Sequence, residues 1–134
     1  MTLNSKLNHY IFLAIVGLLG WFIPGAGHFI IKKKTHALII FFTIITAFTI
    51  GLYVGSFSVI DPTGSKSWYA AQVMNTPAVA IIGHFSVVKG FPVYSRPSEI
   101  GQIYTSITGL LNLLCIVNAV YWAHLLGTKQ EIPD

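Results

Sequence analysis

The strongest constraint on this chain is the segment 37–57, which contains no charged side chain. As a helix with a rise of 1.5 Å per residue, it would be about 31 Å long, which matches the hydrocarbon core of a bilayer. Twelve of its residues are Ile, Leu, Phe or Val, and their insertion terms sum to about −4 to −7 kcal/mol. The segment therefore predicts a membrane-spanning helix.

The composition agrees with a lipid environment. Charged residues make up 9% of the 134-residue chain, and hydrophobic residues make up 54%. Soluble domains contain about 25% charged residues, and small domains need them because their surface is large for their volume. Four acidic and eight basic residues are too few for that purpose. We therefore expect one helical membrane domain over residues 1–134.

A second span is predicted over residues 10–31, with an interruption at Pro24 and Gly25. These two residues should end or kink the helix near Ile23, because proline lacks the N–H of an interior helical residue. In lipid, backbone groups freed by such a break must find partners inside the protein. The predicted structural turn consists of Pro24, Gly25, Gly27 and His28.

A third span is predicted over residues 100–126, which also contain no charge. Residues 77–89 predict a short helix, with proline at its first position and a glycine stop behind it. At about 20 Å it is short for a crossing, so a re-entrant or interfacial helix is favoured. Extension back to Trp68 would make it a fourth span. The predicted fold is all-α, with three transmembrane helices and this short helix.

Basic residues give the expected orientation. Lys32, Lys33 and Lys34 form a cluster between two apolar segments, which is typical of an anchor at lipid headgroups. With three spans, the basic residues divide four to four across the membrane, and with four spans five to three. The dense cluster favours the cytoplasmic side in both cases. Its apolar surroundings argue against nucleic-acid binding, which needs a basic polar face.

Small and weakly polar residues recur at helical spacing along the predicted spans. In lipid, such residues mark helix contacts, because close packing and interhelical hydrogen bonds drive association. The predicted packing residues are Gly17, Gly20, Thr105, Thr108, Asn112, Cys115 and Ala119, with Thr43, Ala47, Gly51 and Gly55 on the middle span. Asn112 is the strongest case, because a buried amide needs a hydrogen-bond partner.

Few groups suit catalysis. The predicted spans contain no Asp, Glu, Lys or Arg, whereas intramembrane charges mark ion and proton pathways. His84 and His124 are candidate axial ligands for a haem or pigment, although interfacial or hydrogen-bonded histidine is the favoured interpretation. We therefore predict no catalytic residue, no metal site and no cofactor.

The segment Trp21-Phe22-Ile23-Pro24-Gly25-Ala26-Gly27-His28-Phe29 resembles the W-x-x-P-G-x-G-H-F motif of an uncharacterised family of small bacterial inner-membrane proteins. Residues 99–105 and 109–114, which read EIGQIYT and GLLNLL, are similar to that family's second block. The first segment also distantly resembles the small two-helix membrane domains. Residues 30–34 depart from the commoner pattern. The resemblance implies a helical membrane protein and no particular activity.

These features favour a non-catalytic, multi-pass protein of the bacterial cytoplasmic membrane. We expect it to be an accessory or assembly subunit, with the lipid bilayer and other membrane-protein subunits as its partners. Two alternatives stay open. One is a cofactor-binding electron-transfer subunit that uses His84 or His124, and the other is a small oligomeric channel or transporter.

Overall fold

The computed structural model describes residues 3–64, 66–90 and 95–129, and within these ranges the chain forms helices and no strand. The long helices are α1 (Leu3–Phe22), α3 (Lys34–Gly55) and α6 (Ser95–Lys129). The shorter elements are α2 (Ala26–Ile30), the 3₁₀ turn η1 (Phe57–Val59), α4 (Lys66–Val73) and α5 (Ala78–Lys89). The all-α prediction is confirmed.

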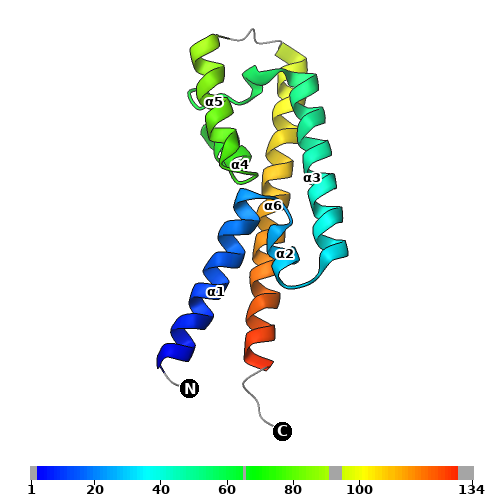
Figure 1. Ribbon diagram of the computed structural model, residues 1–134. Helices are drawn as coiled ribbons and strands as arrows, with labels where there is room; N and C mark the ends of the chain where they lie inside the picture. Colours follow the sequence, from blue (N-terminus) through cyan, green and yellow to red (C-terminus); the bar gives the residue numbers. More distant parts are fainter. Residues whose placement is uncertain (1–2, 65, 91–94, 130–134) are drawn as a thin grey trace.

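Helix α6 is the central element. Its 35 residues make it about 52 Å long. Helix α3 packs along the half of α6 that contains its N-terminus, and α1 packs along the other half (Figure 1). Helices α4 and α5 form a hairpin beside the same half of α6 as α3, so that the hairpin turn faces the C-terminal end of α1 (Figure 1).

Two helices are long and apolar enough to cross a membrane, Lys34–Gly55 and Pro97–Thr128. They correspond to the spans predicted over residues 37–57 and 100–126. The prediction of three spans is not confirmed, because residues 10–31 do not form one helix. Helix α1 ends at Phe22, and Gly25 adopts a left-handed backbone (φ 86°) that turns the chain back along α1.

The region before the third predicted span contains two helices instead of one. Helix α5 begins at Ala78, one residue after the predicted start at residue 77. Helix α4 was not predicted as a separate helix. Its sequence is only weakly apolar, and it is held by packing on α6: an ideal Cβ on Gly109 would lie 1.9 Å from the Ala71 carbonyl oxygen. Only glycine permits this approach.

Side chains on the outside of the bundle are mainly apolar. Tyr53, Val88 and Leu114 are 90%, 67% and 65% exposed, respectively. The buried positions of α6 are instead occupied by small or polar residues, among them Thr105, Thr108 and Asn112. This distribution, with polar groups inside and large apolar groups outside, is the one that lipid favours.

Candidate functional site at the helix junction

The candidate site is the junction where α1, the α4–α5 turn and α6 meet. It originates in two prolines. Pro24 has no N–H, so the carbonyl of Gly20, four residues earlier, lacks its usual helical donor. Asn112 supplies a replacement, because its Nδ2 donates to the Gly20 oxygen at 3.3 Å. The Asn112 side chain of α6 thereby caps the C-terminal end of α1.

The second proline, Pro77, has the same effect at the end of α4. It lies four residues after Val73 and cannot donate to the Val73 carbonyl. Trp21 of α1 supplies this donor, with its Nε1 2.9 Å from the Val73 oxygen. Thr76 donates in return from Oγ1 to the Phe22 carbonyl at 3.1 Å. The interrupted ends of α1 and α4 are thus bonded to each other.

Asn112 bonds both interrupted segments. Besides Gly20, its Nδ2 faces the carbonyl oxygens of Met74 at 3.1 Å and Asn75 at 2.8 Å. An amide nitrogen has two hydrogens, so three acceptors share them. The side chain is 0% exposed, and it lies at the midpoint of the apolar segment Pro97–Thr128. One donor group in the centre of α6 therefore joins two chain segments far apart in sequence.

A second polar contact lies nearer the N-terminal end of α6. The fully buried Gln72 of α4 donates from Nε2 to Thr105 Oγ1 at 2.8 Å and to the Val59 carbonyl at 3.2 Å. The Thr105 hydroxyl in turn donates a hydrogen bond to the Gly101 carbonyl at 2.9 Å. These bonds join α4, the η1 turn and α6.

Three buried amide oxygens accept no hydrogen bond within the described part of the chain. They are Gln72 Oε1, Asn75 Oδ1 and Asn112 Oδ1. Most buried polar atoms in proteins have a partner, so these three oxygens are exceptions within the described residues. Their existence was not predicted, because it depends on which amide atoms the fold engages.

The predicted packing residues lie mostly at helix contacts. Gly17 and Gly20 face Ile116 and Val120 of α6, and Cys115 is half-buried beside them. Thr105, Thr108 and Ala119 are 0 to 1% exposed. On α3, Gly51 and Gly55 pack against Gly101, whereas Thr43 is exposed. The close approach at Gly109 and the buried Ser106 were missed, although both are small residues on a predicted span.

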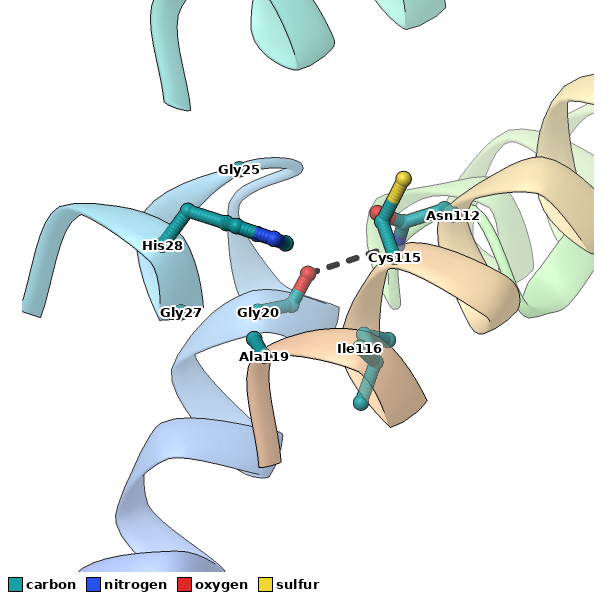
Figure 2. Close-up of a pocket in the computed structure, with 8 residues that line it drawn as sticks. All are labelled: Gly20, Gly25, Gly27, His28, Asn112, Cys115, Ile116 and Ala119. Atoms are coloured by element: carbon teal, nitrogen blue, oxygen red, sulfur yellow. Dashed lines mark hydrogen bonds between the residues drawn. The ribbon is translucent and has the colours of Figure 1, made fainter. Parts of the chain in front are cut away.

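His28 of the predicted turn bonds a side chain of α6. Its Nε2 lies 3.1 Å from the side-chain Oδ1 of Asn118. The ring is 4% exposed, and it points across a crevice towards Asn112 and Cys115 (Figure 2). The crevice is too narrow to hold a water molecule, so it is a packing contact and not a ligand pocket.

The structure does not bring the two candidate cofactor ligands together. His84 is an exposed residue in α5, which lies beside the N-terminal half of α6 (Figure 1). His124 lies near the opposite end of α6, where its Nδ1 is 2.9 Å from Nε2 of His9. Within the described ranges, no group of three or more His, Cys, Asp or Glu side chains could hold a metal ion.

The lysine cluster lies at the start of α3. Lys33 places its Nζ 3.3 Å from the ring centre of Trp122, a cation–π contact. Lys34 lies 5.9 Å from the Phe29 ring centre, and Lys32 is exposed in a left-handed backbone conformation (φ 62°). The Lys33 ammonium group therefore lies at Trp122, a residue type that membrane interfaces favour.

The fold and the junction define an all-helical protein with two helices of membrane-spanning length and a polar centre bonded to its own backbone. The chain belongs to a family of unknown function, DUF6677, which it matches over residues 15–131. The expectation of an uncharacterised family is confirmed, and the matched region contains both segments on which the resemblance was based. No curated protein and no solved structure matches the chain.

Proposed function

We propose that the chain is a non-catalytic multi-pass membrane protein that serves as an accessory or assembly subunit of a larger membrane complex. The observation that carries this proposal is the Asn112 junction, because the central polar group of the longest helix is bonded to the chain's own backbone. Such hydrogen bonds orient helices in lipid. The apolar outer surface then remains available to lipid and to other membrane subunits.

The proposed membrane arrangement has two full spans and two half-membrane hairpins. Helices α3 and α6 cross completely, while α1–α2 enters from one face and α4–α5 from the other. Non-helical backbone at membrane depth is tolerated where protein buries it, and the capped ends at Asn112 meet this condition. Asn112 lies roughly 15 Å along α6 from Trp122, which is about half the thickness of the hydrocarbon core.

This arrangement resolves the tie in the charge count. Lys6, residues 32–34 and Lys129 lie at one face, which gives five basic residues. Lys66, Lys89 and Arg96 lie at the other face, which gives three. Because cytoplasmic loops carry the excess of basic residues, we assign the first face to the cytoplasm.

Cysteine labelling in native membranes tests the arrangement. In a C115S background, cysteines introduced at Lys6, Lys32 and Lys66 are exposed to a membrane-impermeant maleimide. Positions 6 and 32 should be labelled from the same face, and position 66 from the other. If α1 crossed completely, positions 6 and 32 would react from opposite faces. Labelling of all three positions in a membrane-free supernatant would refute the membrane assignment.

The subunit role is tested by gentle solubilisation of native membranes followed by affinity purification of the tagged chain. A second membrane protein should accompany it in fixed stoichiometry and should cross-link to it before solubilisation. Recovery of a stable lone monomer under the same conditions would refute the role.

The three unpaired amide oxygens favour a second candidate, a small oligomeric channel or transporter. Substrate sites in transporters occur near the membrane centre, where interrupted helices meet. Flux of a small solute into reconstituted vesicles that is lost in N112L and retained in N118L would support this candidate. Absence of solute flux in vesicles that are shown to contain the reconstituted oligomer of this chain would exclude the channel or transporter.

A further inference from the structure

An apolar hollow of about 270 Å³ lies between the α1–α2 turn and the first two turns of α3. Ile23, Phe29 and Ile30 line it from the turn, and Leu38 and Phe41 line it from α3. The hollow exists because Gly25 holds the turn against α3: an ideal Cβ on Gly25 would lie 2.5 Å from the Ala37 carbonyl oxygen. Around this close contact, larger apolar side chains line the space between the two segments.

The lysine cluster stands at one end of the hollow. Lys34 precedes Leu38 by four residues and Phe41 by seven, so all three share one face of α3. The Lys34 Nζ is also 5.9 Å from the ring centre of Phe29, which lines the hollow from the other side. Lys34 therefore marks the mouth of the hollow, and the exposed Lys32 lies two residues before it.

No carboxylate neutralises this mouth within the described ranges. The acidic residues described are Asp61, beyond the C-terminal end of α3, and Glu99, in the first turns of α6. Both lie at the opposite end of the bundle from α2 and the start of α3 (Figure 1). Lys33 is already engaged with Trp122, so Lys32 and Lys34 are the cations available to an anion.

We propose that this hollow binds one acyl chain of an anionic phospholipid and that Lys32 and Lys34 hold the lipid phosphate. The proposal rests on the membrane location proposed above. Apolar surface next to ammonium groups matches the two chemical parts of a phospholipid, and basic pockets between membrane helices on the cytoplasmic side bind anionic headgroups. The lysine cluster then binds a particular lipid in addition to anchoring the chain at the interface.

Native mass spectrometry of the detergent-purified full-length chain tests the proposal. The protein is mixed with phosphatidylglycerol or phosphatidylcholine of identical acyl chains. Each lysine contributes attraction to anionic lipid, so we expect retention of phosphatidylglycerol about 10- to 30-fold above phosphatidylcholine. K32Q/K34Q should reduce this preference to about 1- to 2-fold, and K32R/K34R should keep it. K66Q/K89Q, which removes two charges from the opposite face, is the matched control and should change nothing.

A substitution in the hollow tests the acyl-chain part. Ala26 lines the hollow and is partly exposed, so A26W should fill it and lower retention of both lipids several-fold. Thermal unfolding in detergent identifies any variant that fails to fold. Equal lipid retention by A26W and the wild type, or an undiminished preference in K32Q/K34Q, would overturn the proposal. If the chain is recovered without membranes or detergent, the membrane assignment itself has failed.

Discussion

Substitution of Asn112 by leucine should destabilise the bundle more than any other change of one polar side chain on α6. The volume is nearly kept, but the carbonyls of Gly20, Met74 and Asn75 lose their shared donor. Interhelical hydrogen bonds in membranes contribute about 0.6 kcal/mol on average and up to about 1.7 kcal/mol. Two amide hydrogens are lost, so we expect a destabilisation of about 1–3 kcal/mol.

Reversible unfolding in mixed detergent micelles gives this free energy. The lone thiol of Cys115 is a built-in probe, because it is half-buried one turn from Asn112. A thiol-reactive dye should label N112L at a lower denaturing-detergent fraction than the wild type. The matched control is N118L, which makes the same chemical change on the same helix. Asn118 is exposed and bonds one side chain, His28, so its loss should cost about 1 kcal/mol or less.

The three possible outcomes of this comparison are distinct. If N112L is at least 1 kcal/mol less stable than N118L, the junction holds the two hairpins on α6. If N112L is as stable as N118L, the junction is not a determinant of the fold. Faster Cys115 labelling in the absence of denaturing detergent, with an unchanged free energy of unfolding, would show that only the crevice had opened. This result would also refute the role assigned to Asn112.

Three further predictions concern other contacts. W21F removes the donor to the Val73 carbonyl and should cost about 0.6–1.7 kcal/mol in the same unfolding assay, whereas W68F should be near neutral. G109A should cost about 1–3 kcal/mol by overpacking, because its Cβ would lie 1.9 Å from the Ala71 carbonyl oxygen. The control G17A should be tolerated, because its Cβ would lie 3.5 Å from the nearest side-chain atom, Val120 Cγ2. Equal costs for the two substitutions would contradict this prediction. The Thr63 hydroxyl lowers the pKa of the Asp61 carboxyl, so T63V should raise that pKa towards its ordinary value in a carboxyl-carbon NMR titration. In the wild type, the ionised Asp61 carboxylate stabilises the fold above its unfolded pKa, and this stability is lost as the pH falls through the lowered folded pKa. An unchanged Asp61 titration in T63V would refute the role assigned to the Thr63 hydroxyl.

The sequence predicts the parts of this fold that depend on local composition. The uncharged segments identify α3 and α6, and Pro24 explains why α1 ends at Phe22. The need of Asn112 for a partner also follows from its place in an apolar segment. What the sequence alone does not provide is the identity of that partner, because two proline-terminated helices must first be brought to the same level of α6.

Helix α4 is a second element that the local sequence does not predict. Its sequence has mixed polarity, and tertiary packing on α6 overrides the weak local preference. Gln72 and the contact between Ala71 and Gly109 hold it there, and neither pairing can be read from spacing within one segment. The bond from His28 to Asn118 joins residues 90 positions apart and was missed for the same reason.

The position of Asn112 after both hairpins in the sequence has a consequence for biogenesis. Both hairpins are synthesised before the helix that supplies their shared donor. Until α6 is in place, the carbonyl oxygens of Gly20, Met74 and Asn75 lack the Asn112 donor that they have in the folded bundle. Assembly of the junction must therefore wait for α6, and a chain that stops before α6 lacks the donor that joins its two hairpins.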